Sequence, residues 1–194
     1  VRLAIETGLL ASVFPEVPVA GYDAAVERLG HLPQSATATV ALAVLLVDAQ
    51  DPGAMCERLK LSNRETDEVT WLVASRGGLD QAADRKRSQL FPLLAHPSRD
   101  GLLELIDAIR RGAAGPSDDV AWCRALLETV GVEELDPPPL VTGEDLIAVG
   151  LRPGPLFKTL LGSVRDAQLD GDVGDRDEAL AWVHEIRREN EPDE

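Results

Sequence analysis

Apolar residues recur every three to four positions along almost the whole chain, and alternation of the kind seen in strands lasts no more than a few residues. This periodicity predicts an all-α protein with no significant sheet. The expected helices span residues 2–13, 22–30, 34–48, 53–60, 63–76, 79–95, 98–111, 117–130, 143–149, 154–169 and 176–190.

Several of these helices have recognisable start and stop signals. Ser62 precedes Glu65 in a Ser-x-x-Glu capping box, and Ser98 stands before the next apolar-periodic run. Asp175 and the acids that follow it suit the positive end of the last helix. Stops are predicted at Gly77-Gly78 and at Gly131.

The proline triplet Pro137–Pro139 is the clearest boundary, because a residue before proline is steered away from the helical conformation. We therefore expect a helical body over residues 1–136, packed mainly within 1–131, and a small tail domain over 137–194 that contains three helices. The chain begins with Val1 and not with a Met, directly before the helix predicted over 2–13, so the body is expected to be truncated at its N-terminus.

The tail contains a compressed helix–turn–helix. Thr142 is predicted to cap a helix that Glu144 and Asp145 open, and Gly150 is predicted to end it in a left-handed conformation. Pro153 or Pro155 fits the first turn of the next helix. Such a turn leaves backbone N–H groups of the second helix unpaired, where a phosphate can bind.

Composition restricts the partners. Hydrophobic residues make up 44% of the chain and aromatics 4%, which suits helices packed through aliphatic side chains. No apolar run approaches the length of a membrane span.

Cys56 and Cys123 have no ligand-type spacing and are predicted to be buried, reduced thiols of a cytoplasmic protein. The net charge of −15 opposes general nucleic-acid binding, so any RNA contact is expected to come from local basic patches or from a part of the parent protein that this chain lacks.

Three landmarks in order carry a family resemblance. They are Gly8-Leu-Leu-Ala-Ser-Val-Phe-Pro-Glu16, Leu59-Lys-Leu-Ser-Asn-Arg-Glu65, and the stretch from Pro137 to Gly171 with its Thr-Gly-x-Asp-Leu and Gly-Leu-x-Pro-Gly-Pro segments. Together they resemble the C-terminal helical part of class II tRNA nucleotidyltransferases (CCA-adding enzymes) and bacterial poly(A) polymerases. The resemblance implies a module that holds RNA, while an N-terminal head absent from this chain performs the transfer with Mg²⁺ and CTP or ATP. By itself the fragment is expected to be catalytically inactive and to need no cofactor.

Metal chemistry is not predicted for these residues. The pairs Asp170/Asp172 and Asp175/Asp177 lie outside any strand and are better explained as helix-capping groups. In some relatives a helix equivalent to 34–48 ends in a metal-binding His-Asp, but here Val47 precedes Asp48. The three histidines, His31, His96 and His184, share no ligand spacing.

Basic residues are the remaining candidates for a functional site. Arg152, Lys158 and Arg165 flank and follow the turn, and Gly154 allows close approach of a phosphate. The densest cluster is Arg85-Lys86-Arg87, for which a solvated helix face is the simpler explanation. The tryptophans Trp71, Trp122 and Trp182 are predicted to pack in the core rather than stack on bases.

Two functions remain open. The first is binding and positioning of a tRNA or other RNA 3′ end within a nucleotidyltransferase or poly(A) polymerase, with no DNA or membrane partner. The second is an all-helical protein-interaction or oligomerisation domain that kept the scaffold but lost RNA binding, and homo-oligomerisation is compatible with either. The choice between CCA and poly(A) addition is expected to depend on the absent head.

Overall fold

A computed structural model describes residues 7–8, 13, 21–115 and 118–190. Within these ranges the chain forms α-helices and one 3₁₀ turn and contains no strand, which confirms the all-α prediction. The helices are α3 (Tyr22–Gly30), α4 (Ala38–Leu46), α5 (Pro52–Arg58), α6 (Asn63–Ala74), η2 (Ala82–Asp84), α7 (Arg87–Ala95), α8 (Arg99–Gly112), α9 (Asp118–Thr129), α10 (Val132–Leu135), α11 (Gly143–Ala148), α12 (Pro155–Asp170) and α13 (Arg176–Asn190).

The chain divides into two compact units. Unit 1 comprises Val1–Ala83 and His96–Glu128, and unit 2 comprises Asp84–Ala95 and Thr129–Glu194. These limits differ from the predicted division at 136/137, because α7 packs on α12 and therefore joins the C-terminal part of the chain. A single sequence gives no sign of that long-range pairing.

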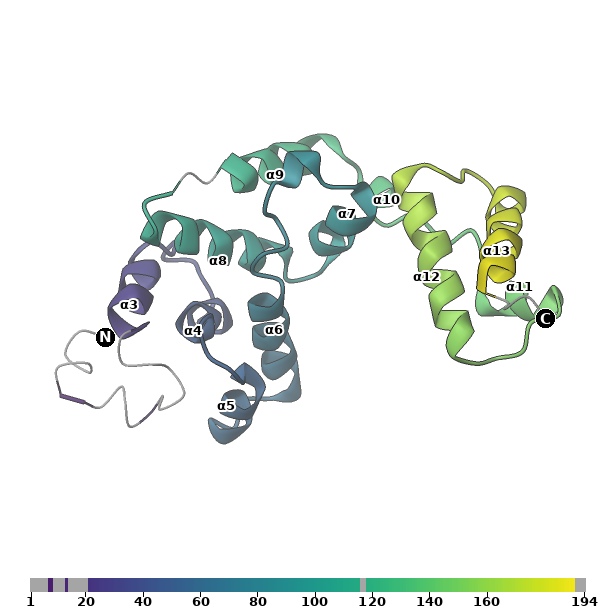
Figure 1. Cartoon of the computed structure of the whole chain (residues 1–194). Helices are drawn as coiled ribbons and strands as arrows, with labels where there is room; N and C mark the ends of the chain where they lie inside the picture. The colour runs from purple at the N-terminus through teal and green to yellow at the C-terminus, as the bar shows by residue number, and fades with distance from the viewer. Residues whose placement is uncertain (1–6, 9–12, 14–20, 116–117, 191–194) are drawn as a thin grey trace. The chain divides into compact units, whose positions relative to one another are not determined.

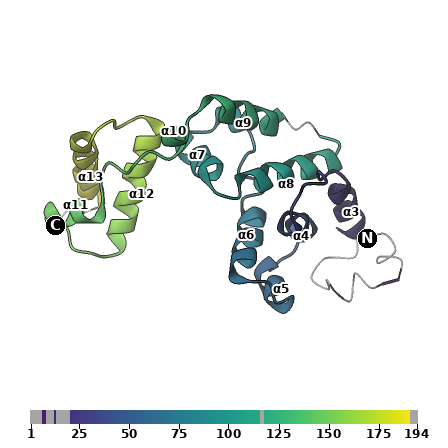
Figure 2. The same cartoon turned by 180° about the vertical axis from the view of Figure 1, so that it is seen from behind.

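Unit 1 is built around α4. This helix is apolar on all sides, which is the pattern of a helix surrounded by others. Ala43, Val44 and Leu46 are fully buried. The helix packs against α3, α6 and α8, and Figures 1 and 2 show it nearly end-on among them. The core of unit 1 therefore forms around one hydrophobic helix.

Unit 2 has a core of its own, formed where α11, α12 and α13 meet. Its buried members are small or medium aliphatic residues: Val141, Leu146, Leu160, Val164, Ala167, Val173, Ala179 and Val183. Both cartoon views show α12 and α13 side by side with α11 near one end (Figures 1 and 2). Unit 2 thus contains the helices predicted for the tail together with α7 and α10.

Two predicted helices differ from the structure. The helix predicted over 34–48 begins only at Ala38, where the Thr37 hydroxyl accepts from the Val40 N–H. The segment 79–95 is divided into η2 and α7, because Gln81 has a φ of +56° and the Asp119 carboxylate accepts from the Gln81 and Ala82 N–H groups. Helix α10 was not predicted. Most of the helix predicted over 2–13 lies outside the described residues.

Some of the predicted helix caps and buried side chains are confirmed and others are not. The capping box of Ser62 and Glu65 is confirmed, whereas Ser98 precedes α8 without a capping bond from its hydroxyl. Both cysteines are free and buried as predicted, and burial raises the pKa of the Cys123 thiol to about 11. Across the described part of the chain, no helix is long and apolar enough to cross a membrane.

The prediction of core packing is wrong for one tryptophan. Trp122 is 38% exposed on α9. Trp71 stacks on His96 with ring centroids 3.6 Å apart, and Trp182 packs against the core of unit 2. The apolar neighbours of Trp122 in sequence do not enclose it, because sequence neighbours on a helix point in different directions.

Candidate RNA-binding surface

A capping box fixes the start of α11, the helix that leads into the turn before α12. Thr142 and Asp145 form a reciprocal capping box at the start of α11. The Thr142 N–H donates to the Asp145 carboxylate at 2.8 Å, and the Asp145 N–H donates back to the Thr142 hydroxyl at 3.5 Å. The predicted cap is therefore confirmed, and it fixes where the chain enters the turn.

Gly150 ends α11 as predicted, with a φ of +86°. The Gly150 N–H donates to the Ile147 carbonyl, and the Leu151 N–H reaches back to the Leu146 carbonyl at 3.0 Å. This pair of bonds is a Schellman motif, which favours glycine because an L side chain is strained at positive φ. The motif sets the direction in which the chain leaves α11 toward α12.

A charged contact joins this turn to the last helix. The Arg176 guanidinium donates to the Asp145 carboxylate at 2.7 Å. The bonds from Arg176 and from Thr142 lower the pKa of Asp145 to about 2, so the carboxylate stays ionised at neutral pH. Arg176 therefore stabilises the start of α11 and is not available to an RNA phosphate in this arrangement.

The first turn of α12 offers fewer unpaired N–H groups than the sequence suggested. Pro155 has no N–H, and the Phe157 N–H donates to the Gly154 carbonyl at 3.0 Å. Gly154 itself is extended, with a φ of 177°. The cations near the turn are therefore a stronger basis for an anion-binding surface than the helix end.

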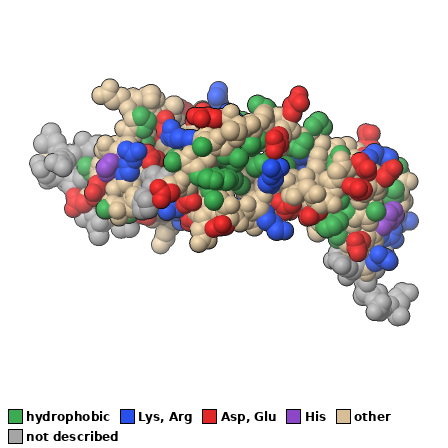
Figure 3. All heavy atoms as spheres, turned by 90° about the horizontal axis from the view of Figure 1, so that it is seen from above, with side chains coloured by type: hydrophobic (Ala, Val, Ile, Leu, Met, Phe, Trp, Pro, Cys, Tyr) green, Lys and Arg blue, Asp and Glu red, His purple; other side chains and the backbone are tan. Residues whose placement is uncertain are grey.

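Arg152 and Lys158 are the two exposed cations at the turn. Within the described part of unit 2, no carboxylate lies within ion-pair distance of either side chain. Elsewhere acidic and basic side chains are interspersed, as the face in Figure 3 shows. Arg152 and Lys158 thus place two exposed positive charges at one turn of a chain whose net charge is −15.

Arg165, the third predicted cation of this surface, has partners within unit 2. Its guanidinium pairs with the Asp136 carboxylate and donates to the Pro137 carbonyl at 2.6 Å. The Gln168 amide donates to the Pro138 carbonyl at 2.8 Å. The side chains of α12 therefore hold the proline segment in place, and this task accounts for Arg165 without RNA.

The side chains of the basic cluster 85–87 also have interaction partners within unit 2. Lys86 lies 3.6 Å from the Asp170 carboxylate, and Arg87 lies 3.2 Å from Glu134 and over the Phe91 ring. Arg85 is half-buried. The cluster joins α7 to α10 and α12, so a structural role explains it as well as RNA binding does.

One aspartate of each Asp-x-Asp pair accepts hydrogen bonds at the start of a helix. Asp170 accepts from the Ser88 N–H and hydroxyl, and although burial opposes ionisation, these bonds and Lys86 lower its pKa. Asp175 accepts from the N–H groups of Asp177 and Glu178 at the start of α13. In the described ranges no three His, Cys, Asp or Glu side chains are grouped to hold a metal, and Val47 directly follows α4 as the sequence implies.

An apolar groove of about 570 Å³ lies beside the same turn. Ile147, Pro153 and Phe157 are its apolar lining residues, and the rest of the lining consists of Thr142, Gly143 and Glu144. Ile147 is 53% exposed. The surface at the turn therefore combines two cations with an exposed apolar strip.

Comparison with known proteins supports a relationship to the tRNA nucleotidyltransferases. The chain is 31% identical over 134 residues to an A-adding tRNA nucleotidyltransferase of Deinococcus radiodurans, a match that covers 65% of this chain. It covers 31% of that protein, so the chain spans less than a third of the length of this curated relative. No family model matches the chain, and no solved structure matches it. The relationship agrees with the sequence landmarks, and the missing head stays a prediction.

Sequence reasoning missed a second site in unit 1. A pocket there brings together Arg28, Arg76 and Arg110 with Asp48, Asp80 and Asp119. These residues are far apart in the sequence and share no motif. Of these residues, the sequence singles out Asp48 alone, through its place after Val47.

Proposed function

We propose that this chain binds and positions RNA, in particular the 3′-end region of tRNA, for a nucleotidyltransferase whose transfer chemistry resides in a separate head. The observation that carries the proposal is the presence of Arg152 and Lys158, exposed and without carboxylate partners, at a turn fixed by two capping motifs. The relationship to an enzyme named for its action on tRNA supports RNA as the polyanion.

The contact would be to the RNA backbone. Arginine and lysine that neutralise phosphates supply affinity and orientation but do not read sequence. A rigid turn is suited to this task, because it places both cations without a large loss of conformational freedom on binding. Mg²⁺ and CTP or ATP would belong to the head, and the protein would act in the cytoplasm.

The test is tRNA binding across a salt series by the intact chain. Replacing both cations, Arg152→Gln with Lys158→Gln, should make the fall of log K with log salt less steep. The magnitude of the slope should decrease by roughly two, about one for each lost phosphate contact. The matched control is Arg64→Gln with Arg188→Gln, which removes the same charge from exposed positions elsewhere. An equal loss in both double variants would mean that only net charge matters.

A second candidate is a protein-interaction or oligomerisation surface, and the apolar groove beside the turn favours it. In that case Ile147→Ser would disrupt self-association measured by sedimentation, and the chain would not bind tRNA even at low salt. Binding to tRNA that weakens steeply with salt would support the first candidate.

A further inference from the structure

The pocket in unit 1 has an apolar floor and charged walls. Val47 and Ile106 are buried and Ile109 is half-buried, and together they form the apolar part of the lining. Its volume is about 700 Å³, which lies in the range of small-molecule sites and far exceeds the space that a single ion needs.

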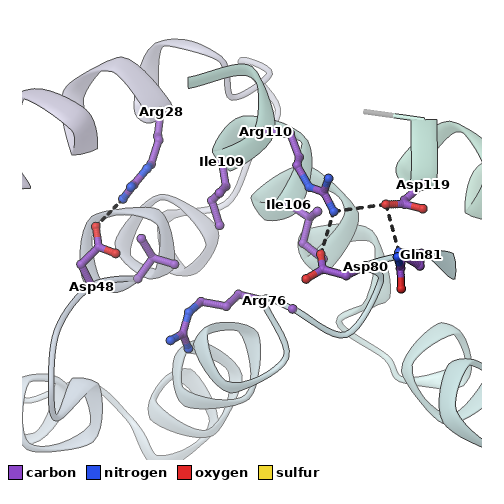
Figure 4. A pocket seen from close by; sticks show the side chains of 11 residues that line it. Arg28, Asp48, Arg76, Asp80, Gln81, Ile106, Ile109, Arg110 and Asp119 are labelled. Atoms are coloured by element: carbon purple, nitrogen blue, oxygen red, sulfur yellow. Dashed lines mark hydrogen bonds and ion pairs between the residues drawn. The ribbon is translucent and has the colours of Figure 1, made fainter. Parts of the chain in front are cut away.

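Two arginines of the pocket are neutralised by carboxylates. Arg28 pairs with Asp48 at 2.6 Å. Arg110 pairs with Asp80 at 2.7 Å and with Asp119 at 3.1 Å. Figure 4 shows these as two separate groups on opposite sides of the pocket. Neither group has positive charge left to attract an anion.

Arg76 lies between the two groups and is joined to neither (Figure 4). One nitrogen of its guanidinium donates to the Val73 carbonyl at 2.9 Å. Within the part of the chain that the structure describes, no carboxylate lies within ion-pair distance of it. A guanidinium has five donors in a fixed fork, so Arg76 keeps donors suited to two oxygens of one oxyanion.

We propose that this pocket binds a nucleoside monophosphate, with its phosphate on Arg76 and its base over Val47, Ile106 and Ile109. The Gln81 carboxamide and the Asp48 and Asp80 carboxylates at the rim offer acceptors and donors for ribose hydroxyls and base edges. This site goes beyond the proposed RNA contact, which lies in unit 2.

The charges of the pocket also limit the ligand. Its lining carries three arginines and three aspartates, so these charges cancel overall: Asp80 and Asp119 share Arg110, and Arg76 is the arginine of the lining that has no carboxylate partner. Further phosphates would meet these carboxylates. A monophosphate should therefore bind more tightly than a triphosphate, which is the opposite of what general anion capture predicts.

The experiment is calorimetric titration of the intact chain with AMP, adenosine, inorganic phosphate and ATP. We expect saturable binding of AMP that is about tenfold or more tighter than that of adenosine or phosphate, since a charge-assisted bidentate contact and the apolar floor must both contribute. ATP should bind more weakly than AMP. Equal binding of AMP and adenosine, tighter binding of ATP, or no AMP binding by the folded chain would each overturn the proposal.

Variants separate this site from the RNA surface. Arg76→Gln should weaken AMP binding about tenfold or more, and Arg64→Gln, on the same unit but outside the pocket, should leave it unchanged. Circular dichroism checks that both remain folded. AMP binding that survives Arg76→Gln would contradict the assignment. Because Arg152→Gln with Lys158→Gln should not affect AMP binding, failure of either proposal would be distinguishable from failure of the other.

Discussion

The two units differ in which of their cations have carboxylate partners. In unit 2, Arg165, Arg176, Lys86 and Arg87 all hold helices or the proline segment together, and Arg152 and Lys158 at one turn are left without carboxylate partners. In unit 1, three arginines line the pocket, and of these described residues Arg76 alone has no carboxylate within ion-pair distance. We therefore expect phosphate binding by this acidic chain to depend less on its net charge than on which cations the fold leaves without carboxylate partners.

The units also differ in how they are stabilised. Unit 1 depends on the buried apolar helix α4, whereas unit 2 has a smaller aliphatic core supplemented by polar contacts to Pro137 and Pro138. Burial of apolar area contributes more free energy than exposed ion pairs do. Disruption of α4 should therefore have the largest effect of the changes considered below.

The largest effect is expected for Leu46→Ala. Leu46 is fully buried on α4, and the cavity should lower the free energy of unfolding of unit 1 by about 2–5 kcal/mol. Hydrogen exchange resolved by peptide measures each unit separately. The control Leu156→Ala changes a leucine that is 38% exposed and should cost much less. Similar losses in the two variants would show that α4 is not the main source of stability.

The contact between α12 and the proline segment should have an intermediate effect. Arg165→Met keeps an aliphatic stem but removes the bonds to Asp136 and to the Pro137 carbonyl. Because the side chain is 26% exposed, we expect unit 2 to lose about 1–2 kcal/mol of unfolding free energy. Faster hydrogen exchange should appear at residues 136–140. Unchanged exchange there would show that the bonds of Arg165 do not stabilise this segment, so that the structural role would no longer explain the residue.

A pair of helix glycines tests packing in the two units. A methyl group on Gly101 in α8 would lie 2.8 Å from a Val40 methyl, whereas Gly162 in α12 has open space around it. Gly162→Ala should stabilise unit 2 by about 0.5–1 kcal/mol, since alanine is the better helix former. Gly101→Ala should destabilise unit 1 despite the same gain. Thermal denaturation of both variants measures the two signs, and equal signs would contradict the close approach of α8 to α4.

The smallest effect is a pH dependence of unit 2. The pKa of Asp145 is lowered in the folded state to about 2, so its contribution to stability is present above about pH 4 and is lost as the pH falls toward 2. Hydrogen exchange of α11 between pH 5 and 2 should therefore show less pH dependence in Asp145→Asn than in the unmodified chain. An identical pH profile for both would mean that Arg176 and Thr142 do not lower this pKa.

Local signals in the sequence predicted local structure well. The helical period, the Ser62 and Thr142 caps and the Gly150 turn are properties of a few neighbouring residues, and all appear in the structure. Contacts between distant residues could not be read in the same way. Nothing near Arg165 indicates that it pairs with Asp136, and nothing near Arg110 indicates Asp80 or Asp119.

The candidate site shows the same limit. The sequence could identify every cation near the turn, but it could not show which of them have carboxylate partners. Arg165 has a carboxylate partner that accounts for its position without RNA, whereas Arg76, which no sequence motif indicates, has none among the described residues. Partner allocation depends on how helices pack, and a single sequence does not specify this packing.

The central claim is that ligands bind where the fold leaves cations without carboxylate partners. Amide NMR spectra recorded during two titrations of the intact chain test this claim most directly. A short RNA duplex with a single-stranded 3′ end is added to one sample, and AMP is added to another. The account predicts that RNA shifts the amides of residues 150–158 in unit 2 and that AMP shifts those of residues 76–81 and 106–110 in unit 1. Shifts from both ligands at the same residues, or RNA shifts spread over the basic residues that already have carboxylate partners, would contradict the account.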